Sequence, residues 1–191
     1  MKKYLGFINL IIFSISIFVC LQLYPEFDFF KDTFSYLGTL KQTAVIFNLT
    51  MIFLGISNFF YLNFIIESYK LKGSSQDVLK IIINLVILSL FMVGLIPLNL
   101  NENLHYLFAF ILFYGLAVGI VFFGIVIAPK NLLFSRFNIG FGIFMILIFS
   151  ILNGALKTNA FNESVYLFLL TLWIFTLFFI NPNKNKVIAK Y

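Results

Sequence analysis

Two short polar segments carry the residue types that could do chemistry. The first holds Asp28, Asp32 and Ser35, and the second holds Glu102 and His105, the single histidine of the chain. A serine becomes a nucleophile when a histidine takes its proton and a carboxylate orients that histidine, so Ser35, His105 and Asp32 form a candidate hydrolytic set. The same two segments also predict, as alternatives, a metal site or a site for a polar ligand.

The metal alternative rests on Asp32, Glu102 and His105, whose carboxylate and imidazole groups suit zinc or a harder divalent cation. A single histidine excludes a site with three imidazole ligands. A single cysteine, Cys20, excludes a cysteine-rich zinc site. The sequence therefore favours no resident cofactor, with a divalent metal as the weaker alternative.

The ligand alternative is that these side chains bind a cationic or hydroxylated lipid headgroup, or another small polar molecule, without reacting with it. Plain structural roles are also open to them. Asp32 could cap a helix, and His105 could bond a loop carbonyl. The predicted ligand-binding residues are Asp28, Asp32, Ser35, Asn48, Glu102 and His105.

Membrane helices must position these residues, because the composition excludes a domain covered by water on all sides. The chain is 62% hydrophobic and 10% charged, whereas soluble domains are about 45–50% apolar and about 25% charged. A helix of roughly 20 apolar residues crosses a bilayer with its backbone groups bonded internally. We predict an all-α fold in a single domain over residues 1–191, a transmembrane bundle of six helices with spans at about 4–24, 43–69, 78–97, 104–128, 138–156 and 165–181.

The basic residues predict the orientation, since cytoplasmic loops hold lysine and arginine preferentially. With both termini in the cytoplasm, only Lys31, Lys41 and Lys157 of the 13 basic residues lie outside. The first span follows Lys2 and lacks a small-residue cleavage site, so we expect it to remain uncleaved. This topology places residues 28–35 and 99–105 on the same outer side. Most acids also lie there, namely Glu26, Asp28, Asp32, Glu102 and Glu163.

Five amides within the spans are expected to face other helices, because an unpaired polar group is costly in an apolar surrounding. Two of them are also candidates to line a pocket, since Asn48 and Asn153 lie in the outer halves of their helices. The five are Asn48, Asn58, Asn63, Asn84 and Asn153.

Gly115 and Gly119 lie four positions apart in the fourth span, a spacing that lets two helix backbones approach closely. This face predicts a contact within the chain or, alternatively, a homo-oligomer or a membrane protein partner. The basic residues are spread over separate loops without an aromatic platform, which excludes nucleic acid. Membrane lipid is the expected partner.

Two motifs resemble the start and the middle of a family of prokaryotic six-helix membrane proteins catalogued as domain of unknown function 998. The first is Asp32-Thr-Phe-Ser-Tyr-Leu-Gly38 with Ala44-Val-Ile-Phe-Asn48 and Gly55, and the second is Gly94-Leu-Ile-Pro97 followed by His105 and Ala109. The resemblance implies a six-helix bundle in a prokaryotic cell membrane and no established reaction. It also implies a shared outer-face set at Asp32, Ser35, Asn48 and His105.

These observations lead to one hypothesis with two alternatives. The chain is predicted to be an integral membrane protein whose outward-facing polar pocket binds a lipid headgroup or a small polar ligand. The alternatives are a lipid-directed membrane hydrolase that uses Ser35, Asp32 and His105, and a structural subunit of a membrane complex.

Overall fold

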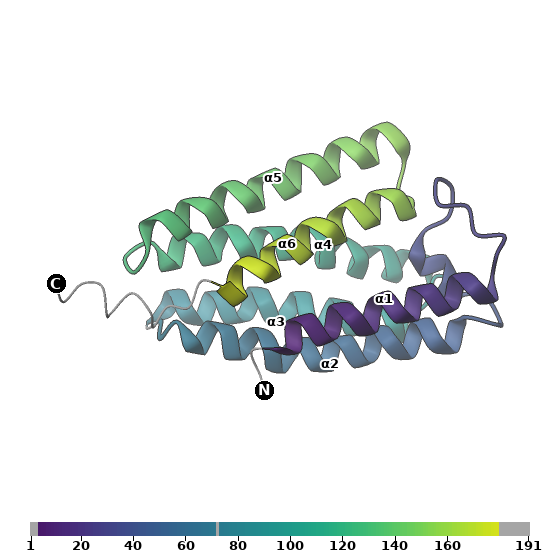
Figure 1. Cartoon of the computed structure of the whole chain (residues 1–191), viewed down its shortest axis with the longest axis horizontal. Helices are drawn as coiled ribbons and strands as arrows, with labels where there is room; N and C mark the ends of the chain where they lie inside the picture. Colours follow the sequence, from purple (N-terminus) through teal and green to yellow (C-terminus); the bar gives the residue numbers. More distant parts are fainter. Residues whose placement is uncertain (1–3, 72, 180–191) are drawn as a thin grey trace.

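The chain folds into six long helices, with a long connection between the first two and short connections between the others (Figure 1). The structure is a computed structural model that describes residues 4–71 and 73–179. No strand occurs in these residues, so the predicted all-α fold is confirmed. A short 3-10 helix, η2 (Phe34–Gly38), follows the first long helix, and the long helices are α1 (Leu5–Leu23), α2 (Ala44–Ser68), α3 (Ser74–Leu95), α4 (Glu102–Ile127), α5 (Leu132–Leu156) and α6 (Ala160–Phe179).

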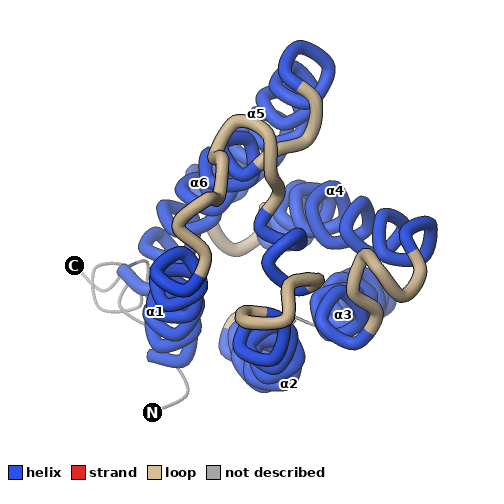
Figure 2. Tube along the Cα trace, turned by 90° about the vertical axis from the view of Figure 1, so that its right-hand side faces the viewer, coloured by secondary structure: helices blue, strands red, loops and turns tan. Residues whose placement is uncertain are grey.

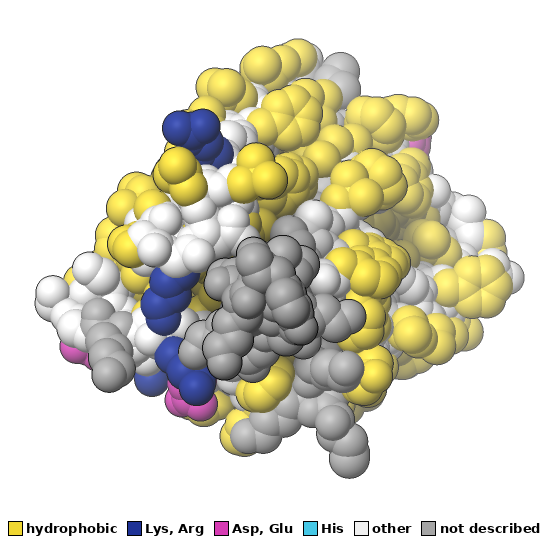
Figure 3. Space-filling view, turned by 60° about the vertical axis from the view of Figure 1, so that its left-hand side comes forward, with side chains coloured by type: hydrophobic (Ala, Val, Ile, Leu, Met, Phe, Trp, Pro, Cys, Tyr) yellow, Lys and Arg dark blue, Asp and Glu magenta, His cyan; other side chains and the backbone are white. Residues whose placement is uncertain are grey.

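All six long helices are long and apolar enough to cross a membrane, as predicted for a multi-pass protein. Only 28% to 39% of the residues in their apolar windows are buried inside the bundle, so most of these residues are at least partly exposed. Large apolar side chains cover these outward faces, and Phe18 and Phe168 are 62% and 63% exposed. Figure 3 shows apolar side chains along the body, and basic side chains toward the end that carries the α2–α3 and α4–α5 connections.

Three helices begin earlier than predicted. α3 begins at Ser74, α5 at Leu132 and α6 at Ala160, whereas their spans were expected to begin at about residues 78, 138 and 165. Some predicted features lie outside the described residues. They are the end of the sixth span at residue 181, the basic residues that follow it, and Lys2, Lys3 and Lys72.

Asparagine caps explain two of these early starts. The Asn131 side chain accepts a hydrogen bond from the Phe134 N–H at 3.0 Å, and the Asn159 side chain accepts one from the Asn162 N–H at 3.0 Å. Each cap satisfies an N–H that has no partner within the first turn of its helix. The first turn of α6 contains the polar residues Asn162 and Glu163, so Glu163, expected in a loop, is a residue of α6.

Helices α2 to α5 pack against one another in chain order through glycines. A Cβ at Gly94 of α3 would lie 2.6 Å from the main-chain oxygen of Asn48 in α2, so only glycine allows this approach. A Cβ at Gly115 or Gly119 of α4 would lie 3.0 Å from a side chain of α3. The contact within the chain predicted from these two glycines is confirmed, and association with a second copy or another membrane protein stays a prediction.

Hydrogen bonds between amide side chains join several helices, as predicted. They confirm an interhelical role for four of the five predicted amides. The bonds are Asn9 to Asn58 at 3.0 Å between α1 and α2, Asn63 to Asn84 at 3.1 Å between α2 and α3, and Asn162 to Asn153 at 3.1 Å between α6 and α5.

Helix α6 is held differently, because it contains no glycine and meets its neighbours through large side chains. Viewed from the end, it lies between α1 and α5 (Figure 2). The ring centroid of Tyr166 in α6 lies 5.0 Å from that of Phe113 in α4. Trp173 Nε1 of α6 donates to Asn138 Oδ1 of α5 at 2.8 Å. Long side chains keep the α6 backbone away from the other helices, and this spacing leaves room for cavities.

Candidate functional site

One end of the bundle contains a polar cavity of about 280 Å³ that brings two of the predicted residues together. Ser35, in η2, and His105, in the first turns of α4, both line it. Its other polar residues are Thr33, Asn153, Thr158 and Glu163, and its aromatic wall is formed by Tyr106, Phe110, Phe113, Tyr114 and Phe149.

His105 is 1% exposed and is oriented by the main chain. Its Nδ1 lies 2.7 Å from the carbonyl oxygen of Ile96. A carbonyl can only accept, so Nδ1 carries the proton and Nε2 of the neutral ring carries the lone pair. Nε2 is buried and has no hydrogen-bond partner in the described part of the chain. The interpretation that His105 bonds a loop carbonyl is confirmed, and Nε2 remains an acceptor without a donor.

Glu163 is the residue of this site that sequence reasoning missed. It is 6% exposed, and its Oε2 accepts from the Phe34 N–H at 2.8 Å. Among the described residues, the ion pairs join Asp28 with Lys31 and Glu67 with Lys80, and none involves Glu163. A capping asparagine four positions earlier could have indicated a helical acid. Its burial depends on a contact 129 residues away, which no local pattern shows.

A second, apolar cavity of about 150 Å³ lies between α6 and helices α1 to α4. Phe13, Leu112 and Trp173 are among the side chains that line it. The two cavities adjoin, because they share four lining residues, which are Ser35, Ala109, Phe113 and Glu163.

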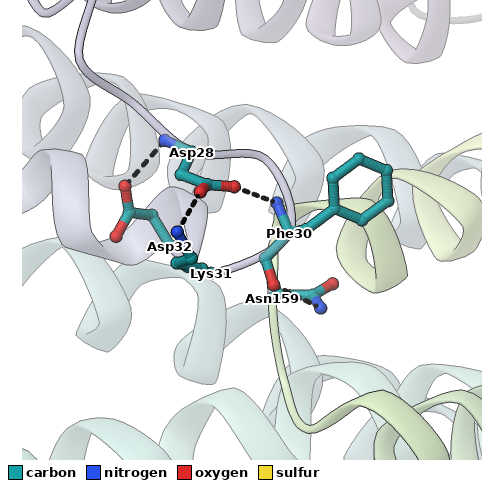
Figure 4. A network of polar contacts seen from close by, with 5 residues as sticks. All are labelled: Asp28, Phe30, Lys31, Asp32 and Asn159. Carbon is teal, nitrogen blue, oxygen red and sulfur yellow. Dashed lines mark hydrogen bonds and ion pairs between the residues drawn. The ribbon is translucent and has the colours of Figure 1, made fainter.

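Asp28 and Asp32 shape the segment before η2 (Figure 4). Asp32 Oδ2 accepts from the Asp28 N–H at 2.9 Å, and Asp28 Oδ1 accepts from the Phe30 N–H at 3.0 Å. The Lys31 ammonium, 2.9 Å from Asp28 Oδ2, lowers the pKa of that carboxyl. Neither aspartate lines the two cavities, so their side chains act on the main chain beside the site.

The same segment holds the start of α6, and we call these contacts the clasp (residues 28–34 with 159–163). The Ala160 N–H donates to the Asp32 carbonyl at 2.7 Å, and the Phe161 N–H donates to the Phe29 carbonyl at 3.1 Å. Asn159 Nδ2 donates to the Phe30 carbonyl at 3.1 Å (Figure 4). The clasp satisfies N–H groups that the first turn of a helix leaves without partners, and it positions Glu163 in the cavity wall.

Asn48 and Glu102, the remaining predicted binding residues, line neither cavity. Asn48 Nδ2 donates to the Gly38 carbonyl at 3.0 Å, whereas its Oδ1 is buried with no hydrogen-bond partner in the described residues. A Cβ at Gly38 would lie 2.5 Å from that oxygen, so a larger residue there would displace the Asn48 amide. Glu102 is an exposed residue in the first turn of α4.

Metal ligands were predicted as a weaker alternative at Asp32, Glu102 and His105. In the described residues, no group of three or more histidine, cysteine, aspartate or glutamate side chains could hold a metal ion. The residues that line the polar cavity include an imidazole, a buried carboxyl group and an aromatic wall.

Comparison with known families finds one match of nearly full length. The family described as "Protein of unknown function (DUF998)" matches residues 7–180. This range contains α2 to α6, α1 from Phe7 onward, and every described residue that lines the two cavities except Gly6. No curated protein and no solved structure matches the chain.

Proposed function

The chain belongs to the DUF998 family of proteins of unknown function, and from this premise we propose that it binds an amphiphile, such as a membrane lipid. The polar part of the molecule occupies the polar cavity of about 280 Å³, and its apolar part enters the adjoining cavity of about 150 Å³. The observation that carries this proposal is the shared wall of Ser35, Ala109, Phe113 and Glu163.

The size and composition of the two cavities support this function. Together they fall within the range of roughly 300–1,000 Å³ that is usual for small-molecule sites. Tyr106 and Phe110 are 50% and 60% exposed, so the aromatic wall of the polar cavity continues to the bundle surface. A lipid can reach the site along this wall without crossing the tightly packed side of the bundle.

The proposal includes an orientation in the cell membrane of a prokaryote, with the termini in the cytoplasm and the polar cavity outside. The end opposite the cavity carries four of the described basic residues, Lys70, Lys80, Lys130 and Arg136, which is typical of a cytoplasmic face. In a Cys20→Ser background, Lys31→Cys should react with an impermeant thiol reagent on intact cells, and Lys130→Cys should not. The reverse pattern would overturn the orientation.

The binding function is tested by the lipid retained after detergent purification. Ala109→Phe places a ring in the wall shared by the two cavities and should reduce retained lipid from about one molecule per chain to a small fraction of that. Ala155→Phe is the matched control, because Ala155 is an exposed residue of α5. Equal retention by the wild-type protein and both variants would overturn the proposal.

A hydrolase is the second candidate function, because Ser35 and His105 line one cavity. In this reaction Nε2 of His105 takes the Ser35 hydroxyl proton while Oγ attacks an acyl carbonyl. The proton then passes to the leaving group, and water releases the acyl chain from Ser35. The Ile96 carbonyl, rather than Asp32, orients the imidazole.

Product analysis separates the two functions. A hydrolase releases fatty acid from a bound ester or amide lipid, and His105→Ala abolishes that release. A binding protein returns the lipid unchanged, and His105→Ala changes at most its retention.

A further inference from the structure

The buried carboxyl group of Glu163 lacks a cation within the described protein. Its Oε2 accepts from a neutral main-chain N–H, that of Phe34. The three lysines at this end do not pair with it, since Lys31 pairs with Asp28 and the side chains of Lys41 and Lys157 are exposed. Burial of a carboxylate costs free energy unless an opposite charge or a bound proton accompanies it. A positively charged ligand beside the wall shared by the two cavities would therefore stabilise the ionised form of Glu163.

Aromatic rings line the rest of the polar cavity and form one continuous wall. The centroids of Phe110 and Tyr114 lie 4.6 Å apart, those of Tyr114 and Phe149 lie 5.5 Å apart, and those of Phe149 and Phe113 lie 4.8 Å apart. The faces of such rings attract ammonium groups, and cages of aromatic residues bind methylated ammonium in particular.

The same cavity is poorly suited to an anionic group. No lysine or arginine is among the described residues that line it. Nδ1 of the one imidazole donates to the Ile96 carbonyl, so in the neutral ring Nε2 accepts rather than donates. A phosphate or carboxylate would meet Glu163 without a compensating charge.

We infer that the polar cavity binds an organic ammonium group, with Glu163 as counter-ion and the aromatic wall around its alkyl substituents. This inference rests on the proposed amphiphile-binding function and specifies its ligand as an amphiphile with a cationic headgroup. Primary amines and trimethylammonium groups share this chemistry. The apolar cavity beside Glu163 favours a ligand with an acyl or alkyl chain over a free ammonium ion.

The test is calorimetric titration of the purified full-length protein in a neutral detergent. The probes are dodecyltrimethylammonium, its uncharged isostere with a tert-butyl head, dodecyl phosphate and tetramethylammonium. The wild-type protein should bind dodecyltrimethylammonium about tenfold more tightly than the uncharged isostere, and dodecyl phosphate most weakly of the three dodecyl probes.

Three variants test whether the preference for the ammonium probe over its uncharged isostere arises in the polar cavity. Glu163→Gln removes the charge and keeps an oxygen that accepts from the Phe34 N–H, so the preference for the ammonium probe should fall to about one. Glu67→Gln is the matched control, because Glu67 pairs with Lys80 at the far end of α2 and should keep the preference. Tyr106→Leu changes a half-exposed residue of the aromatic wall and should reduce the preference for the ammonium probe several-fold. This variant tests the site even if Glu163→Gln does not fold.

Each outcome has a distinct meaning. Equal binding of the charged and uncharged dodecyl probes, or a preference for dodecyl phosphate, would overturn the ammonium inference and leave amphiphile binding standing. Failure of all three dodecyl probes to bind would overturn the proposed function itself. Tetramethylammonium binding as tightly as the dodecyl cation would support the ammonium chemistry and overturn a lipid as its source.

Discussion

Helices α2 to α5 approach one another through glycines, whereas α6 meets its neighbours through aromatic side chains. A Cβ at Gly94 would lie 2.6 Å from the α2 main chain, and one at Gly142 of α5 would lie 2.7 Å from the main-chain oxygen of Ala117 in α4. Across the bundle, Tyr166 and Trp173 reach from α6 to α4 and α5. The glycine contacts leave no space where they lie. The apolar cavity lies between α6 and helices α1 to α4, and the polar cavity lies between α4 and α5 at the end where Glu163 of α6 joins them. Stability and binding therefore depend on different contacts of the bundle.

This difference divides the residues of the two sequence motifs into two groups. Gly38, Asn48 and Gly94 make close contacts in the packed region. Ser35 and Ala109 line the wall between the cavities, and His105 lines the polar cavity. Residues of one sequence motif therefore need not belong to one site. Only the second group, Ser35, Ala109 and His105, lines the cavities and can contact the ligand.

The largest expected effect comes from disturbing the packed side. Gly94→Ala forces a methyl group against the main chain of α2 and should destabilise the protein by about 1–3 kcal/mol. Gly140→Ala is the control, because a Cβ there meets nothing within 4 Å. Thermal unfolding in detergent should show a lower midpoint for the first variant and an unchanged or higher one for the second. Equal midpoints would refute the role of Gly94.

A smaller effect is expected at the clasp, which fixes α6 at the cavity end. Asn159→Ala removes a helix cap and the bond to the Phe30 carbonyl, and should cost about 1–2 kcal/mol. Asn131→Ala removes only the corresponding cap of α5 and should cost about 1 kcal/mol. Hydrogen exchange at residues 28–34 should accelerate in the first variant alone. Acceleration in both, or in neither, would contradict a clasp that joins these segments.

The smallest effect concerns the exposed pair of Asp28 and Lys31. The folded state lowers the pKa of Asp28 from its ordinary value of 3.8, so the pair stabilises the fold above that pH and loses its effect as the pH falls through the lowered pKa. Asp28→Asn should therefore reduce the acid sensitivity of the unfolding midpoint by about a degree or less. An unchanged acid profile in this variant would show that the pair does not contribute to stability.

The six helices could be predicted from the sequence, because lipid requires long apolar segments and the chain has six of them. The starts of α5 and α6 could not, since each helix begins directly after a capping asparagine, Asn131 or Asn159, in a stretch where polar residues such as Arg136 and Glu163 resemble a loop. Ser35 and His105 could be predicted as neighbours, because an even number of spans separates their segments. Burial of Glu163 depends on Phe34 of a distant segment, and such contacts leave no periodic pattern in the sequence.

Fluorescence of Trp173, the single tryptophan, tests most directly whether one amphiphile occupies both cavities. Trp173 lines the apolar cavity and is 3% exposed, so detergent outside the bundle has little contact with it. A lipid brominated on its acyl chain should quench Trp173 saturably in the wild-type protein, and unbrominated lipid should reverse the quenching. In Ala109→Phe the saturable quenching should disappear. Equal, non-saturating quenching in both proteins would contradict the account.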